Sequence, residues 1–401
     1  MKHSTSIFGQ VLSLISRKEF ARHVHESRSE RNSKGFDSWT QFVSMLFCQL
    51  AQAKSLREIC DGLRACLGKL AHLGVKNAPK RSTLSYANAH RPWELFQQLY
   101  YDVLEMCRSA SPGKKRKFRF KNKLLSLDAS IIELCADIFD WAKYRRAKGA
   151  VKLHLLLDHD GYLPVFANIT EAREHEINVA KRLILPTGSI IAVDRGYIDY
   201  ALFQMWTEAK VWFVTRMKKN AVYRVEERLD VPKHRNIVSD ELIRLTGFQA
   251  RRDCNVTLRR VVVWDAQRNE EIVLLTNHLG FGATTIAAIY KDRWEIELFF
   301  KALKQNLKVK TFVGTSSNAL HIQIWTALIA MLLIKYLQFK STRNWSLSNL
   351  VALLRWNLFT YRDLWKWVND PYNLPPAPPD LVQLKLPFLD SNLSQKGSIL
   401  K

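Results

Sequence analysis

Two aspartates of this sequence have surroundings that suit metal-dependent phosphodiester chemistry. Asp128 follows the apolar run 124–127, and Asp194 follows the apolar run 190–193. A carboxylate at the end of an apolar strand is costly to bury unless it is paired or bound to a metal. Mg²⁺ takes oxygen ligands and keeps several waters, so two or three carboxylates are enough. A single strand-end aspartate is more often a helix cap or a turn residue, but two in one region favour the chemical interpretation.

A third acid, Glu297, lies in a stretch predicted to be helical. At about 100° per residue, Tyr290, Arg293, Glu297 and Lys304 share a stripe about 60° wide beside the apolar stripe of this helix. Glu295 falls on the far side and is expected to be solvated. An amphipathic helix with ordinary ion pairs, such as Arg293–Glu297, would show the same spacing. The functional alternative is a metal-binding carboxylate with a Tyr, an Arg and a Lys that contact phosphate oxygens.

The composition points to a folded, nucleic-acid-binding protein. The 401 residues are 47% hydrophobic and carry a formal net charge of +24, which indicates two or three domains and a polyanionic partner. A basic membrane-surface protein is the competing interpretation. Six cysteines without a CxxC spacing argue against a zinc ribbon or a disulfide scaffold, and fit a reducing cytoplasm. No secretory signal is evident, and the longest apolar stretch, 324–334, is too short for a bilayer and predicts a buried helix.

The chain divides into a helical part and an α/β part. The first 110 or so residues have helical periodicity, and a break followed by the basic, polar stretch Lys80–Arg91 outlines a helix-turn-helix. A plain surface helix would give the same pattern. The breaker and basic run Ser111–Lys117 marks a boundary, either as a solvated linker or as a phosphate contact. Further along, the sequence predicts a strand at 124–127, a hairpin of 151–158 and 162–169 around Asp160-Gly161, a helix at 174–185 and a strand at 189–193. Mostly strands are predicted over 207–282. Helices are predicted at 283–309 and 318–340, followed by an aromatic helical segment at 356–367 and a proline-rich flexible tail.

These motifs, in this order, resemble those of the DDE transposases of bacterial insertion sequences, most of all the insertion-sequence-four family. The family signature Tyr-x2-Arg-x3-Glu-x6-Lys matches at every gap from Tyr290 to Lys304. The first aspartate motif is 128–130, in which Ala129 replaces a more common Ser or Thr. The second motif, Asp-x-Gly-Tyr, is 194–197. The resemblance covers about residues 118–340.

The resemblance implies an α/β fold: an RNase H-like catalytic core interrupted by a mostly β insertion and preceded by an all-helical N-terminal domain. With this fold, the expected parts are a helical DNA-binding domain at 1–115, the first part of the core at 116–206, the insertion at 207–282, the second part of the core at 283–345, and a C-terminal helical segment with a flexible tail at 346–401.

The resemblance also implies the chemistry. Asp128, Asp194 and Glu297 are expected to hold two Mg²⁺ ions, or Mn²⁺ in their place, for cleavage of transposon ends and strand transfer into target DNA. The expected DNA contacts are Tyr290, Arg293 and Lys304, joined by Arg216 and Lys218 on a basic strand of the insertion. The partner is double-stranded DNA, bound by a homodimer in the bacterial cytoplasm at the nucleoid, with no membrane.

Weaker expectations and two alternatives complete this interpretation. Trp212 is a poor candidate for stacking on a flipped base, and the pair His175-Glu176 resembles a pair in relatives but is more often structural. The sequence alone leaves open a catalytically inactive DNA-binding relative that acts as a repressor. It also leaves open an RNase H-like nuclease that hydrolyses DNA without strand transfer.

Overall fold

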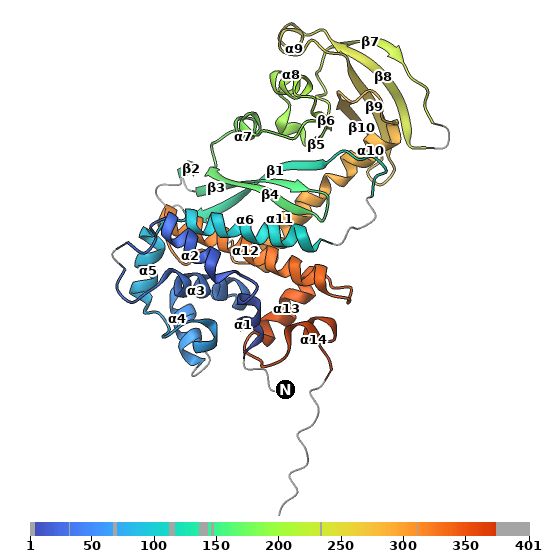
Figure 1. Cartoon of the computed structure of the whole chain (residues 1–401). Helices are drawn as coiled ribbons and strands as arrows, with labels where there is room; N and C mark the ends of the chain where they lie inside the picture. Colours follow the sequence, from blue (N-terminus) through green and yellow to red (C-terminus); the bar gives the residue numbers. More distant parts are fainter. Residues whose placement is uncertain are drawn as a thin grey trace, which may run out of the picture.

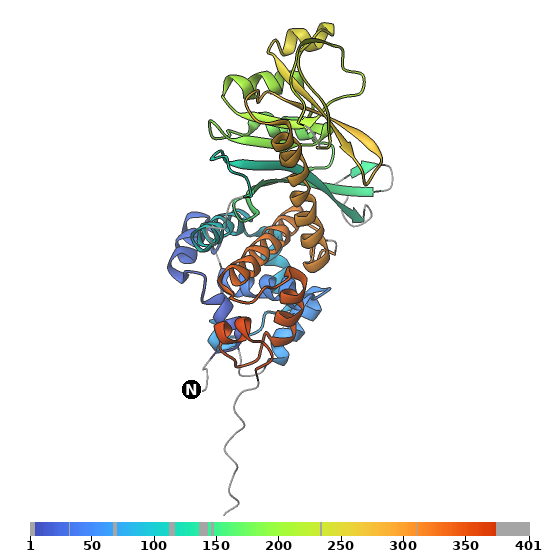
Figure 2. The ribbon, with the colours of Figure 1, turned by 90° about the vertical axis from the view of Figure 1, so that its right-hand side faces the viewer.

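The computed structural model describes residues 5–31, 33–66, 70–111, 117–135, 143–145, 148–232, 235–309 and 311–373. The chain forms a helical body at one end and a large sheet with its own helices at the other (Figure 1). The beginning and the end of the described chain both lie in the helical body, whereas its middle forms the sheet (Figure 2).

Helices from both ends of the sequence share one hydrophobic core in the helical body. Helix α12 runs through this core, with buried residues on all of its sides, and packs against α3, α5 and α6. Among the described residues it is the one helix long and apolar enough to cross a membrane, but 83% of its apolar window is buried inside the protein. The prediction of a buried helix here is confirmed. The helices of the body are α1 (Ile7–Leu12), α2 (Arg17–Glu26), α3 (Ser38–Ala51), α4 (Leu56–Ala65), the 3₁₀ turn η1 (Ala71–Leu73), α5 (Arg81–His90), α6 (Glu94–Ala110), α12 (Ser317–Lys340), α13 (Leu347–Asn357) and α14 (Leu364–Asn369).

The first helix is tied to the segment that follows α13. The N–H groups of Ile7 and Phe8 donate to the carbonyls of Thr360 and Leu358, at 3.0 and 2.8 Å. The sequence divisions at 115 and 346 therefore separate parts that pack together, because α1–α6 and α12–α14 build one body. The predicted proline-rich tail lies outside the described residues, as does most of the basic run before Lys117.

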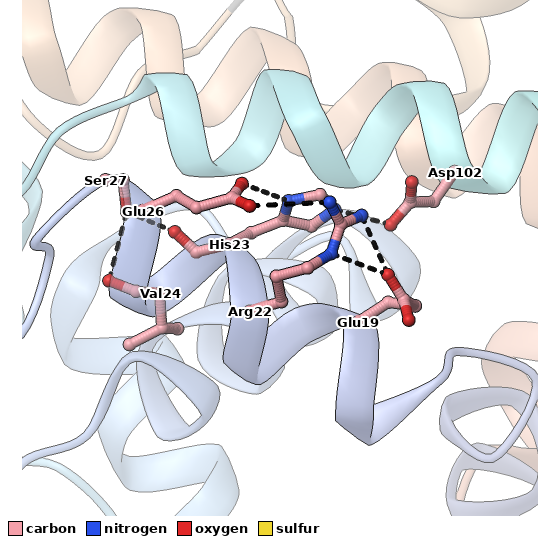
Figure 3. A network of polar contacts seen from close by, with 7 residues as sticks. All are labelled: Glu19, Arg22, His23, Val24, Glu26, Ser27 and Asp102. Atoms are coloured by element: carbon pink, nitrogen blue, oxygen red, sulfur yellow. Dashed lines mark hydrogen bonds and ion pairs between the residues drawn. The ribbon is translucent and has the colours of Figure 1, made fainter.

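Polar contacts fasten the outer helix α2 to α6. Nε2 of His23 lies 2.6 Å from Oδ2 of Asp102, and Glu26 approaches the other ring nitrogen at 3.5 Å (Figure 3). Arg22 pairs with Glu19 on the same helix at 2.7 Å. His23 is nearly buried, so its contact with Asp102 fixes how α2 lies on the body.

Ten strands of the described chain form one mixed sheet, in the order β2-β3-β1-β5-β6-β10-β9-β8-β7 with β4 also on β3. Strands β1, β3 and β4 are antiparallel neighbours, whereas β1, β5 and β6 are parallel neighbours. This arrangement is consistent with an RNase H-like core. The strands are β1 (Leu124–Cys135), β2 (Lys143–Arg145), β3 (Lys148–Asp158), β4 (Leu163–Glu171), β5 (Ile190–Val193), β6 (Trp212–Arg216), β7 (Tyr223–Arg228), β8 (Ile237–Leu245), β9 (Leu258–Asp265) and β10 (Glu270–Thr276).

Alternating side chains of β1 and β5 serve the two faces of the sheet. Leu125 and Leu127 pack in the core under α7 (Glu176–Arg182) and α8 (Tyr200–Glu208). Leu124 packs instead in the core under α10 (Ala283–Asp292), with the buried residues of that helix. Helix α11 (Trp294–Asn306) continues from α10 toward the helical body. The side chains of Asp128 and Asp194, which follow these strand residues, can therefore lie on either the α7–α8 face or the α10 face.

The β-rich insertion is an extension of the core sheet. Strand β6 lies within the range 207–282 predicted as the insertion, and it pairs in parallel with β5. Strand β10 pairs antiparallel with β6, and β9, β8 and β7 follow outward. The short helix α9 (Phe248–Asp253) interrupts these strands. The predicted hairpin of β3 and β4 is confirmed.

Candidate active site

Asp128 and Asp194 follow paired residues on neighbouring parallel strands. The register places Leu127 of β1 opposite Val193 of β5, and each aspartate is the next residue along its strand. Residues in register on parallel strands point to the same face, about 4.8 Å apart. By alternation this is the face that α10 covers. The prediction that Asp128 ends its strand is wrong, because β1 continues to Cys135 while it pairs with β3.

The turn after β5 holds the carboxylate of Asp194. Asp194 caps the 3₁₀ turn η3 (Arg195–Tyr197), and its Oδ1 accepts a hydrogen bond of 2.7 Å from the N–H of Gly196. From β6, the hydroxyl of Thr215 donates to the carbonyl of Asp194 at 3.1 Å. A Cβ placed on Gly196 would lie 3.0 Å from Oδ1. The glycine of the Asp-x-Gly motif thus leaves the carboxylate the space it occupies.

Glu297 comes to this face of the sheet on α11. Arg293 joins α10 to α11 with helical backbone angles (φ −51°, ψ −31°), so the predicted helix is nearly continuous. Nη2 of Arg293 donates to Oε1 of Glu297 at 2.6 Å. Seven residues beyond Glu297, Nζ of Lys304 donates to the β1 carbonyl of Ile131 at 2.9 Å.

Helix α11 and strand β1 advance by matching amounts between the predicted site residues. From Glu297 to Lys304 the helix rises about 10 Å at 1.5 Å per residue. From Asp128 to Ile131 the strand advances about 10 Å at 3.3 Å per residue. Because Lys304 is fixed at Ile131, a helix that follows β1 carries Glu297 to the level of Asp128.

The pKa of Asp128 reflects this crowding of charges. The pKa of Asp128 is raised to about 7, chiefly because the carboxyl is shielded from water, and the negative charges of Asp194 and Glu297 contribute to the rise. The hydrogen bond from the N–H of Ala129 and the charge of Arg293 act in the opposite direction. The three acids therefore belong to one electrostatic neighbourhood, in which a cation would favour the ionised carboxylates.

The donor chemistry of these acids fits a divalent metal ion. Carboxylate oxygens are the ligands that Mg²⁺ and Mn²⁺ prefer. The negative charges of Asp194 and Glu297 act on a third carboxyl, that of Asp128, and a cation would offset their repulsion. In the part of the chain that the structure describes, no three His, Cys, Asp or Glu side chains are gathered as a metal site would require. Glu297 is engaged with Arg293 instead.

Two guanidinium groups approach the ring of Tyr290. The Cζ atoms of Arg293 and Arg216 lie 5.4 and 5.8 Å from the ring centre. Nε of each arginine is buried and has no hydrogen-bond partner among the described residues. Two guanidinium charges beside an acidic cluster are suited to attract a phosphate group.

Two other candidates lie away from this group. Lys218 contacts the carbonyl of Ile198 at 3.4 Å and the ring of Tyr200 at 5.9 Å, on the side of α8. Trp212 is half-buried and packs edge-on against the ring of His278, 4.9 Å between centres. The structure therefore brings Arg216, but not Lys218, to Tyr290.

The remaining predicted positions have structural contacts. Glu176 pairs with Lys152 of β3 at 2.7 Å, and His175 precedes α7 as an exposed residue. Glu295, expected to be solvated, is half-buried. Its charge helps to raise the pKa of Tyr162, after burial and Asp292.

Sequence reasoning missed a buried polar cluster next to the site, formed by Ser126, His159 and Asp292. One signal was present. At about 100° per residue, Asp292 falls beside the apolar stripe of the helix rather than on its solvated side. An acid on a buried stripe needs a partner, but the partner could not be named from spacing.

Comparison with known proteins identifies the family. Residues 119–333, more than half of the chain, match the Transposase DDE domain. The chain belongs to this family. It is a DDE transposase, and the residues matched include all three acids together with Tyr290 and Lys304. Residues 3–76 match a second family, described as a domain of unknown function (DUF4372).

Similar proteins carry related names. The transposase is 30% identical to a putative transposase y4zB of Sinorhizobium fredii over 64% of this chain and 71% of that protein. It is 28% identical to a probable transposase for insertion sequence element IS5377 of Geobacillus stearothermophilus, over 67% of this chain and 70% of the other. Transposase InsG for insertion sequence element IS4 of Escherichia coli is 24% identical over 47% of this chain and 44% of that protein. A piggyBac transposase synaptic complex with hairpin DNA is more distant, with a TM-score of 0.48 and 10% identity over 88% of this chain and 80% of that one.

Proposed function

We propose that this transposase cuts the ends of a bacterial insertion sequence and joins them to target DNA, with Asp128, Asp194 and Glu297 as its metal ligands. The observation that carries the proposal is the shared face of β1, β5 and α11, where the charges of Asp194 and Glu297 both act on the half-buried Asp128. The ion is Mg²⁺, with Mn²⁺ as a substitute. When bound, such an ion lowers the pKa of water and stabilises charge on phosphate oxygens.

The basic side chains around these acids have a separate task. The guanidinium groups of Arg293 and Arg216 direct positive charge toward the scissile phosphate or its neighbours, and Tyr290 holds the two groups in place. Lys304 fixes α11 on β1 and adds positive charge near the DNA backbone. Lys218 reaches the DNA farther from the acids. Binding and orientation of the phosphate supply much of the catalysis in phosphoryl transfer.

The decisive experiment supplies precleaved end DNA with a free 3′-hydroxyl, a target plasmid and Mg²⁺. We expect strand-transfer product from the wild type and none from Asp128→Asn, with end binding retained by both. Hydrolysis without joining would indicate an RNase H-like nuclease. End binding with neither reaction would indicate a repressor-like relative. Either result would overturn the proposal.

We further propose that the helical body binds DNA through a cavity of about 890 Å³ between the start of α4 and one side of α5. The lining contains three exposed cationic side chains, Lys54, Arg57 and Arg81, and none of the described residues that line the cavity is acidic. No ion pair within the described residues neutralises these three cations. The exposed Tyr86 stacks on His90 at 4.1 Å beside them. The residues that line the cavity are Lys54, Ser55, Leu56, Arg57, Arg81, Ser82, Ser85, Tyr86, Ala89, His90, Phe312 and Val313.

The exposed face of α5 has the make-up of a helix that enters a DNA groove. Arg81, Ser82, Ser85 and Tyr86 follow the three- and four-residue spacing of one face, and they are exposed while Leu84 is buried. Small and hydroxylated side chains with a flanking Arg allow close approach to base edges and phosphates. This supports the predicted helix-turn-helix role of residues 80–91.

A salt series tests this DNA interface. Each lost phosphate contact should lower the slope of log K against log salt by about 0.9. Arg57→Ala with Arg81→Ala should therefore lower the slope for end DNA by about two. The matched control Lys18→Ala with Arg31→Ala removes two exposed charges from the same body and should leave the slope unchanged. Equal slopes for both double variants would show that the cations of the cavity do not contact the DNA.

Two copies of the chain are proposed to act together at the bacterial nucleoid, because two transposon ends must be joined in one event. Trp356 of α13 is 79% exposed and offers an apolar contact for a second copy. Light scattering with paired-end DNA should show a dimer, which Trp356→Ala should weaken. Microscopy of a labelled protein should place it on the nucleoid.

A further inference from the structure

Three buried polar residues connect β1 to the end of α10 immediately before the site. Oγ of Ser126 lies 2.7 Å from Nε2 of His159, and Nδ1 of His159 lies 2.6 Å from Oδ2 of Asp292. A carboxylate can only accept, so the imidazole donates to Asp292 through Nδ1. Nζ of Lys117 contacts the other oxygen of Asp292. Four separate elements are thus joined through one carboxylate.

The order Ser-His-Asp resembles a nucleophilic triad, but these three side chains are buried and therefore cannot act on a substrate. Ser126 is 0% exposed, and the side chains of His159 and Asp292 are 6% and 1% exposed. No substrate can reach a hydroxyl in such a place. Buried groups of this kind are costly to leave unsatisfied. The hydrogen bonds of Ser126, His159 and Asp292 therefore hold the elements that carry them in one arrangement.

Two of these hydrogen-bonded residues, Ser126 and Asp292, lie at a short, countable distance along the chain from Asp128 and Glu297. Ser126 precedes Asp128 by two residues, about 7 Å of strand. Asp292 precedes Glu297 by five residues, about 7.5 Å of helix. The second contact, from Lys304 to Ile131, lies about 10 Å beyond on both elements. The facing pair of acids is therefore bracketed by two anchors between β1 and the helix.

We propose that His159, together with Ser126 and Asp292, is a positioning group that fixes α11 along β1 and so sets the place of Glu297 relative to Asp128. This inference rests on the proposed metal-ligand role of these acids. His159 takes no part in the chemistry. It acts through the helix junction, because Asp292 immediately precedes Arg293, the partner of Glu297.

The test compares Asp292→Asn and Ser126→Ala with Asp240→Asn. The control removes an equally buried carboxylate, which pairs with Arg259 at 2.6 Å between β8 and β9. Outer-shell partners of metal ligands typically change metal affinity or activity by 10–100-fold. We expect single-turnover cleavage at saturating end DNA to fall about 10–100-fold in Asp292→Asn and less in Ser126→Ala. The Kd for end DNA should stay within about twofold. Asp240→Asn should lower the melting temperature but keep the cleavage rate well below that temperature.

Hydrogen exchange without metal gives a readout independent of activity. Amides of α11 should exchange faster in Asp292→Asn than in wild type. In Asp240→Asn their exchange rates should equal those of the wild type. If both Asp292→Asn and Ser126→Ala matched the control in exchange and cleavage, the positioning role would be refuted. If Asp292→Asn did not fold, Ser126→Ala would decide alone. A wild type as inactive as Asp128→Asn would refute the proposed function, whereas the exchange result would stand by itself.

Discussion

Replacing Gly196 by alanine should reduce cleavage by displacing a single carboxylate. The added Cβ would lie 3.0 Å from Oδ1 of Asp194, against about 3.4 Å for an ordinary close contact. The backbone of Gly196 lies outside the left-handed region, so alanine is tolerated there. The carboxylate must therefore move by about 0.4 Å, and its hydrogen bond from the N–H of residue 196 must lengthen or bend.

The size of this effect follows from the cost of misplacement. A displacement of 1 Å at a reacting centre can cost about 100-fold in rate, so 0.4 Å corresponds to about sixfold. Single-turnover cleavage of labelled end DNA at saturating protein and Mg²⁺ measures it directly. The Kd for end DNA and the melting temperature should be nearly unchanged.

Gly247→Ala is the matched control. A Cβ on Gly247 would meet its nearest neighbours at 3.9 Å, an ordinary contact, and the residue lies in the β-rich insertion. This variant should cleave at the wild-type rate. If Gly196→Ala also cleaved at the wild-type rate across a Mg²⁺ series, the placement of Asp194 by the turn after β5 would not matter for the reaction.

Two further predictions concern α11. Glu297→Gln should abolish cleavage but keep end binding, whereas Glu295→Gln should remain near the wild-type rate; equal losses in a single-turnover assay would contradict the assignment of helix faces. Lys304→Ala removes the contact with the carbonyl of Ile131, and should lower cleavage about tenfold as α11 loses an anchor, with a smaller salt slope of end binding. Unchanged cleavage and salt dependence would leave that lysine without the proposed role.

Local signals were sufficient for the elements that hold the acids. The run before Asp194 predicted β5, and the spacing from Tyr290 to Lys304 predicted a helix that places Glu297 beside the core edge, as observed. These predictions depend on periods of two and 3.6 residues, which a sequence states directly. The site residues remain predictions, because family membership does not test them one by one.

The features that were missed depend on distant partners. Strand β1 extends past Asp128 because β3 pairs with it along its length. Strand β6 has the same local pattern as the strands that follow it, and its pairing with β5 could not be read from that pattern. The position of α12 inside the N-terminal helices could not be read from a run of apolar residues. In each case tertiary pairing, not local preference, decides the outcome.

The raised pKa of Asp128 predicts how metal binding should depend on pH. Because the pKa rises from 3.8 to about 7 in the folded protein, the metal-free folded state binds a proton between these values that the unfolded state releases. The contribution of Asp128 to the free energy of unfolding therefore falls as the pH rises from about 3.8 to about 7. Metal binding must release the same proton, so its apparent affinity should rise about tenfold per pH unit up to about pH 7 and then level off.

Melting temperatures with and without Mg²⁺ between pH 5.5 and 8.5 can measure this competition. The stabilisation by Mg²⁺ should grow from the acid end and level off above about pH 7. In Asp128→Asn, which has no proton to release there, the residual stabilisation should lack this slope. A wild-type stabilisation of equal size at every pH would mean that the ion does not bind at Asp128, since an ion that displaces a proton from a carboxylate must compete with that proton for the site.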